Sequence, residues 1–143
     1  MYNLNQFDVR SFFFDLQSKA EKKEPLTDLE KIAYSVILEH PEYNNILQNK
    51  DKYLEFKWSV ENGETNPFLH LSMHLSILEQ LSIDQPVGIK NLFEKLCKKF
   101  DNEHDSTHQL IDCLGEMIWL SQRNNTAPDP QIYFECINKK LSV

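Results

Sequence analysis

The stretch NPFLHLSMHLSILEQL, residues 66–81, decides the fold of this chain because it carries the clearest helical pattern in the sequence. Asn66 suits the position that caps the start of a helix. Pro67 suits the first helical position, where its missing N–H group would have had no partner inside the helix. We therefore expect a helix over residues 66–82 with a well-defined beginning.

The two faces of this central helix differ in polarity. At 100° per residue, one arc collects apolar residues and both histidines of the stretch, namely His70, His74, Ile77, Leu78 and Leu81. The opposite arc collects the polar residues Ser72, Ser76, Glu79 and Gln80. The histidines therefore point with the apolar residues, and each buried ring nitrogen needs a hydrogen-bond partner or a metal ion.

Histidines four residues apart stand on one helical face, which is the spacing that lets two imidazoles hold one metal ion. Carrying the phase of the preceding helix forward turns His40 inward as well, although a histidine in a last helical turn also interacts well with the helix dipole. Three imidazoles would suit Zn, Fe, Ni or Cu and would leave positions open for water or substrate. Carboxylates, backbone carbonyls or buried water could satisfy the same rings, so a structural role is the alternative.

A second series, His104, His108, Asp112 and Glu116, also repeats every four residues. Helical phase places Asp112 and Glu116 nearly opposite the apolar face, which is typical of a solvated acidic surface. A second packing face around Gly115 could still bring His108 and Glu116 inward. The predicted metal ligands are therefore His40, His70, His74, His108 and Glu116, with Zn, Fe or Ni as the metal.

Composition and charge favour one helical domain that spans residues 1–143. Only 3 glycines are present, which is few for a fold that needs many tight turns. The net charge of −7 argues against a surface for nucleic acid or anionic lipid. No apolar run reaches the length of about 20 residues that a membrane span needs, and the N-terminal residues do not resemble a signal peptide. We expect a cytoplasmic protein.

The remaining helices follow from apolar spacing and from capping signals. A helix over about residues 5–22 precedes a second helix, in which Thr27 and Glu30 form a capping box. The second helix carries an apolar stripe of Leu29, Ile32, Ala33, Val36 and Ile37. Further helical turns are expected within residues 41–49, and three more helices within residues 89–100, about 106–123 and from 130 onward. The predicted fold is thus a compact bundle of five to six helices around the central one.

One segment breaks the helical pattern. Large apolar residues alternate with polar ones over residues 53–61, which is the period of a half-buried strand. No second alternating run exists to pair with it, so we expect either an extended strap across the helices or an edge that pairs with a partner. A homodimer or a protein partner could therefore bind the aromatic segment 53–60.

Cysteines and catalytic motifs give no sign of a reaction. Cys97, Cys113 and Cys136 are odd in number and lack zinc-motif spacing, so we expect reduced thiols in apolar surroundings. The chain has no GxSxG elbow, no glycine-rich phosphate loop and no HExxH signature. We therefore assign no catalytic residue. Metal-activated hydrolysis or redox chemistry is the class to expect of an enzyme with these histidines.

The chain resembles a bacterial family of unknown function, the domain of unknown function numbered eighteen forty-one. The resemblance rests on HPEY (residues 40–43), NPFLHLSMHLSILEQL (66–81), DQPVGI (84–89) and HQLIDCLGEMIWLSQR (108–123). It covers nearly the whole chain and implies a small stand-alone protein, but it brings no activity and no catalytic residues. Two hypotheses stay open: a helical protein that binds a divalent transition metal, and a non-catalytic interaction module whose histidines are structural.

Overall fold

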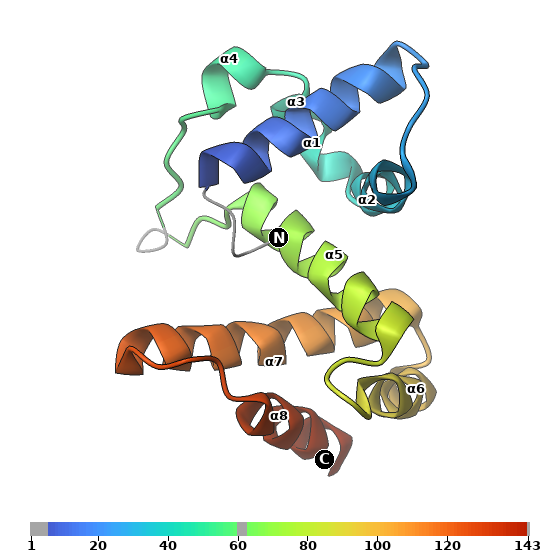
Figure 1. Ribbon diagram of the computed structural model, residues 1–143, viewed down its shortest axis with the longest axis vertical. Helices are drawn as coiled ribbons and strands as arrows, with labels where there is room; N and C mark the ends of the chain where they lie inside the picture. The colour runs from blue at the N-terminus through green and yellow to red at the C-terminus, as the bar shows by residue number, and fades with distance from the viewer. Residues whose placement is uncertain (1–5, 60–62, 143) are drawn as a thin grey trace. The chain divides into compact units, whose positions relative to one another are not determined.

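The computed structural model describes residues 6–59 and 63–142, and every regular element within them is a helix (Figure 1). The elements are α1 (Gln6–Glu21), α2 (Asp28–Leu38), the 3-10 helix η1 (Pro41–Tyr43), α3 (Asn44–Leu47), α4 (Lys50–Tyr53), α5 (Pro67–Ile83), α6 (Ile89–Phe100), α7 (Glu103–Asn124) and α8 (Pro130–Ser142). The prediction of a mostly helical chain is confirmed. Of the helices described, none is long and apolar enough to cross a bilayer.

The chain divides into two compact units, residues 1–76 and residues 77–143. The division falls inside α5, after Ser76, so each unit contains part of this helix. The first unit also contains α1 to α4, and the second contains α6 to α8. The single domain that the sequence led us to expect stays a prediction.

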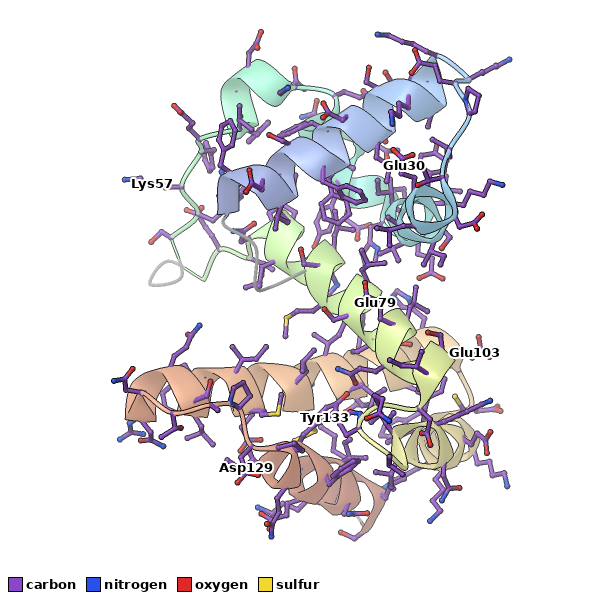
Figure 2. The ribbon with its side chains drawn as sticks, in the orientation of Figure 1. Glu30, Lys57, Glu79, Glu103, Asp129 and Tyr133 are labelled. Carbon is purple, nitrogen blue, oxygen red and sulfur yellow. A yellow bond between two sulfur atoms is a disulfide. The ribbon has the colours of Figure 1, made fainter. Side chains whose placement is uncertain are left out.

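In the first unit, α1 and α2 pack together through side chains that are almost completely buried. The capping box predicted at the start of α2 is confirmed, because Glu30 N–H donates to Thr27 Oγ1 and Thr27 N–H donates to Glu30 Oε1. Glu30 also accepts a bond of 2.8 Å from Lys19 Nζ on α1 (Figure 2). The apolar stripe of α2 is narrower than predicted: Ala33, Val36 and Ile37 are buried, whereas Leu29 and Ile32 are exposed.

The segment after α4 is held by a buried arginine. Arg10 on α1 is 2 % exposed, and its Nη1 donates to the carbonyl oxygens of Tyr53, Leu54 and Phe56 at 3.1, 3.1 and 2.6 Å. Its guanidinium also lies over the Trp58 ring, 4.8 Å from the centroid, which is a favourable cation–π arrangement. Since the carbonyl oxygens of Tyr53, Leu54 and Phe56 accept hydrogen bonds from Arg10, they do not need a partner strand as their donor.

The predicted extended segment 53–61 is therefore wrong as a strand. Residues 50–53 form α4, residues 54–59 have no regular secondary structure, and residues 60 and 61 lie outside the described part. The alternation of apolar and polar residues reflects which side chains pack inward, because Tyr53, Leu54 and Trp58 contact the core of the first unit. This packing agrees with the strap that we considered as one of two interpretations.

Helix α5 begins where the sequence predicts. The Asn66 side chain accepts hydrogen bonds from the N–H groups of Phe68 and Leu69, so Asn66 caps the helix. The predicted polar face is wrong for Ser72 and Ser76, which are only 2 % and 5 % exposed. Ser72 tolerates burial because its hydroxyl donates to the Phe68 carbonyl one turn earlier. The predicted exposure of Glu79 is confirmed (Figure 2).

The second unit is built from α6, α7 and α8, which pack against one another. Its core contains Leu96, Leu110, Leu114 and Ile137, none of which has measurable exposure. Tyr133 of α8 is also fully buried, and its hydroxyl donates to Gln80 Oε1 at 2.8 Å, which attaches α8 to the last part of α5 (Figure 2). The hydroxyl of this buried tyrosine thus has a specific partner.

A disulfide between Cys113 of α7 and Cys136 of α8 overturns the prediction of three reduced thiols. Their Cα atoms are 5.5 Å apart, within the range that a disulfide requires. The sequence could not show this pairing, because the two cysteines are separated by 23 residues and approach each other only when α7 packs on α8. Cys97 of α6 is the free cysteine.

The disulfide predicts a thiol count. Unfolded without reductant, the protein should expose one reactive thiol, that of Cys97, and after reduction it should expose three. Because the bond restricts the unfolded chain, its reduction should lower the free energy of unfolding by about 2–4 kcal/mol. Colorimetric thiol titration and urea unfolding measure the two quantities. Three reactive thiols before reduction would contradict this assignment.

Candidate metal centre

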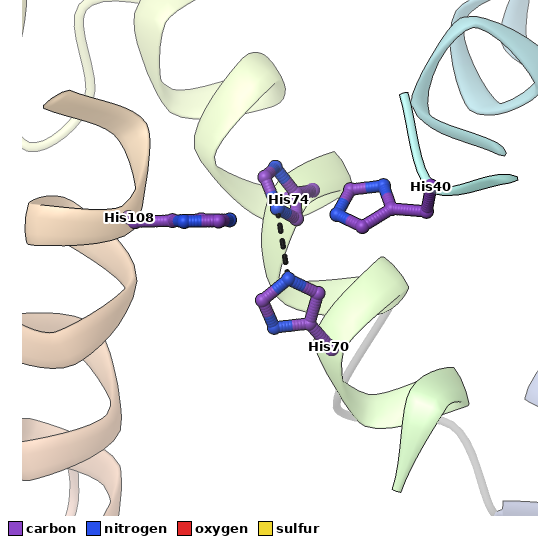
Figure 3. Close-up of side chains that lie close together, drawn as sticks. All are labelled: His40, His70, His74 and His108. Carbon is purple, nitrogen blue, oxygen red and sulfur yellow. Dashed lines mark hydrogen bonds between the residues drawn. The ribbon is translucent and has the colours of Figure 1, made fainter. Parts of the chain in front are cut away.

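His70 and His74 lie one turn apart on α5, with their side chains directed at each other. His74 is 2 % exposed and His70 is half-buried. The Nε2 atoms of the two rings are 3.1 Å apart, and the ring centroids are 4.7 Å apart (Figure 3). Phe68 and Leu71 on the same part of α5 are fully buried, so the helix cannot rotate the histidines toward solvent without losing this packing.

The His40 ring lies beside those of His70 and His74, although His40 comes from the segment that follows α2. Helix α2 ends at Leu38, and His40 precedes the η1 turn that begins at Pro41. Pro41 disfavours helical geometry at His40, whose φ of −127° and ψ of 62° turn the chain out of α2. The predicted inward position of His40 is confirmed, because its exposure is 2 %.

The orientation of the His40 ring is fixed by its backbone. Its Nδ1 lies 2.8 Å from the Val36 carbonyl oxygen. A carbonyl oxygen can only accept a hydrogen bond, so Nδ1 carries a proton and, in the neutral ring, Nε2 carries the lone pair. A histidine that donates one ring N–H to a backbone carbonyl and offers the other nitrogen is the arrangement typical of metal ligands.

The three rings of the first unit converge. The His40 ring centroid is 5.0 Å from that of His70 and 4.6 Å from that of His74. One nitrogen from each of the three rings lies within 4.8 Å of the others. Two nitrogens bound to one zinc ion at about 2.0–2.1 Å stand about 2.9–3.4 Å apart for angles of roughly 90–110°. The His70–His74 separation already falls in this range.

Metal binding would change the bonding of His70 and His74. In the metal-free arrangement, one Nε2–H donates to the other Nε2, so only one of the two rings offers a lone pair there. A metal ion needs both lone pairs, so the donating ring would have to move its proton to Nδ1. His70 and His74 therefore have two possible bonding states, one with the internal hydrogen bond and one with a bound ion.

Tyr43 covers one face of His40. The two rings are stacked at a centroid distance of 5.4 Å and an interplanar angle of 5°, and Tyr43 also meets the His70 ring edge-on at 6.2 Å. Desolvation, followed by the nearby charge of Glu42, raises the pKa of the Tyr43 phenol above 10.0. Tyr43 therefore stays neutral and acts as a wall of the cluster. Its spacing of three residues from His40 is the pattern in the sequence that could have indicated this role.

The other two predicted ligands lie on α7, in the second unit. His108 is half-buried. Glu116 is exposed two turns further along the helix, and Asp112 is exposed and lies 3.5 Å from Lys140 Nζ. In the described residues, the metal-competent cluster that includes His40, His70 and His74 contains no carboxylate and no thiol.

Helices and a convergent group of imidazoles thus define a helical protein with a candidate transition-metal centre. The chain belongs to the family described as Domain of unknown function (DUF1841), whose model matches residues 5–139. The resemblance noted in the sequence is confirmed, and this membership assigns no activity. No curated protein and no solved structure matches the chain.

The His40 geometry predicts one tautomer. In metal-free protein, nitrogen-15 NMR of the imidazole should show a protonated Nδ1 and an unprotonated Nε2 for the neutral His40 ring, because Nδ1 donates to Val36. His40→Asn identifies the resonance. A neutral His40 that carries its proton on Nε2 would contradict the orientation from which the metal-binding argument begins.

Proposed function

We propose that this protein binds one divalent transition-metal ion through His40, His70 and His74 of the first unit. The observation that carries the proposal is the convergence of three histidines in the first unit, with two Nε2 atoms 3.1 Å apart. Two of these residues, His40 and His74, are only 2 % exposed. Such burial of adjacent imidazoles is costly unless every nitrogen is satisfied.

The ligand type supports a choice of metal. Neutral imidazoles suit Zn, Fe, Ni and Cu, whereas Mg, Ca and Mn prefer carboxylate and carbonyl oxygens. Since no carboxylate belongs to the described cluster, the bound ion would keep its full double positive charge. We therefore propose Zn, Fe or Ni as the ion.

His108 decides what kind of site this is. The four-residue spacing on α7 makes His108 the candidate that the sequence offers for a fourth ligand. Four protein nitrogens would close a tetrahedral zinc site, which is typical of a structural metal. Three would leave a position for water or substrate, which metal-activated hydrolysis or redox chemistry needs. Glu116, exposed on α7, is the weaker candidate for completing the set.

An interaction module with structural histidines is the second candidate function. It is favoured by the hydrogen bonds that the rings already make, His40 to the Val36 carbonyl and His70 to His74. A homodimer or partner would bind the segment 53–60. Tyr53, Leu54 and Trp58 pack against the core of the first unit, so Phe56, with 37 % exposure, is the apolar contact that this surface would offer.

Metal content measured by elemental mass spectrometry separates the two functions. Untagged wild-type protein should contain close to one transition-metal ion per chain, and His70→Ala/His74→Ala should contain less than about a tenth of this amount, because two of the ligands are lost. The measurement uses the 143-residue chain dialysed against chelator-free buffer.

Two further variants serve as controls. Met73→Ala removes a side chain of 8 % exposure between the two histidines but no ligand, so it should keep the metal despite a loss of stability. His108→Ala should lower the affinity roughly tenfold or more if His108 is a ligand. Wild-type protein that stays empty after reconstitution with Zn²⁺, Fe²⁺ and Ni²⁺ would overturn the proposal and favour the interaction module.

A further inference from the structure

Helix α7 carries a large aromatic side chain on the face opposite its buried side. Trp119 is 56 % exposed. Helical phase explains this exposure, because Leu110, Leu114 and Met117 point to nearly the opposite side of the helix and are buried in the second unit. Trp119 therefore lies on a face of α7 that α6 and α8 leave open.

Two opposite charges flank Trp119 on this face. Glu116 comes three residues before it and Arg123 four residues after it, and both are exposed. The Arg123 guanidinium lies over the Trp119 ring, 5.2 Å from the centroid. Within the described residues, neither Glu116 nor Arg123 takes part in an ion pair. Tryptophan and arginine are among the residue types that are enriched at the centres of protein interfaces.

The spacing of the two charges makes this face complementary to itself. Glu116 and Arg123 are seven residues apart, which is about 10.5 Å along the helix, and Trp119 lies near the midpoint. If two copies of α7 pack antiparallel about a twofold axis at this midpoint, Glu116 of each copy lies beside Arg123 of the other. The two Trp119 rings then pack together between two ion pairs.

The neighbouring residues favour a second copy of this chain as the partner. Gly115 has no side chain beside Glu116, so the arginine of the second copy can reach the carboxylate. The face also carries one charge of each sign. A purely acidic or purely basic partner would oppose one of these two charges with a like charge, whereas the same face turned around pairs both.

We propose that the α7 face defined by Glu116, Trp119 and Arg123 binds the same face of a second copy, which forms a symmetric dimer. This inference does not rest on the proposed function, because the dimer needs no bound metal. It also uses a different surface from the segment 53–60. One helix from each copy buries less area than the about 1,200–2,000 Å² of a stable complex, so we expect a weak dimer in exchange with the monomer.

Sedimentation equilibrium of the metal-free chain, with a chelator present, tests the dimer. The average mass of the wild-type protein should rise from that of one chain toward that of two as the concentration increases from about 1 μM to about 1 mM. Trp119→Ala should raise the dimer Kd roughly tenfold or more, because the central side chain of the contact is lost. Since Trp119 is exposed, this variant should keep the helical circular dichroism of the wild type.

Reversal of the two charges tests the register. Glu116→Arg alone and Arg123→Glu alone each oppose like charges at both ion pairs of the symmetric dimer, so each should raise the dimer Kd roughly tenfold or more at low salt. A one-to-one mixture of these two variants should form a heterodimer with an affinity close to that of the wild-type dimer, because each contact again joins opposite charges. Glu116→Arg/Arg123→Glu in one chain should restore the homodimer for the same reason.

Glu94→Arg is the matched control, because it makes the same change of charge at an exposed position of α6 and should keep the wild-type dimer affinity. A wild-type protein that stays monomeric over the whole range of concentrations would overturn the proposal. A dimer that neither single charge reversal weakens would place the interface elsewhere. Single variants that weaken the dimer, but are rescued neither by mixing nor by the double substitution, would show that Glu116 and Arg123 do not face each other across it.

Discussion

The burial of His40 and His74 beside the half-buried His70 is the constraint on which the first unit depends. A ring nitrogen that loses water on folding needs a partner, because the cost of an unsatisfied polar group is about 1–3 kcal/mol. Two hydrogen bonds offset part of this cost. The His40 Nδ1–H donates to the Val36 carbonyl, and His70 and His74 share one hydrogen bond. The Nε2 atoms of His70 and His74 face each other at 3.1 Å, which is close to the separation of two nitrogen ligands on one metal ion. Two rings that share a hydrogen bond without a metal are therefore also placed to accept one.

Two other polar side chains, Asn66 and Arg10, keep this arrangement in place. Asn66 caps α5 and fixes where the helix begins, which determines the direction of His70 and His74. Arg10 lies beside Trp58 and 5.5 Å from the centroid of Phe68, at the start of the same helix. Because Arg10 also binds the carbonyl oxygens of Tyr53, at the end of α4, and of Leu54 and Phe56 after it, the aromatic segment closes over the N-terminal part of α5. Polar contacts thus position α5, and apolar contacts stabilise it.

Local signals in the sequence predicted much of the fold. Capping residues such as Thr27 and Asn66 and prolines such as Pro41 act within a few residues, so they indicate where helices begin and end without knowledge of the rest of the chain. The inward position of His40 also followed from helical phase. The burial of Ser72 and the exposure of Leu29 could not be predicted from helical phase. They depend on which faces of a helix other elements cover, and packing decides this.

Contacts distant in the sequence could not be predicted in the same way. The carbonyl groups that Arg10 binds are 43 to 46 residues away, and an arginine among phenylalanines gives no indication of this role. The Cys113–Cys136 disulfide likewise depends on the packing of α7 against α8. For the candidate site, spacing selected His70 and His74, whereas the stacking of Tyr43 on His40 required the η1 turn.

X-ray absorption spectroscopy of the metal-loaded protein tests the central claim most directly, because it reports the atoms that surround the ion. Our account predicts a first shell of nitrogen or oxygen atoms at about 2.0–2.1 Å for zinc, with the multiple-scattering pattern of three or four imidazoles. A shell that contains sulfur, or one with fewer than two imidazoles, would contradict the assignment of His40, His70 and His74 as the metal site.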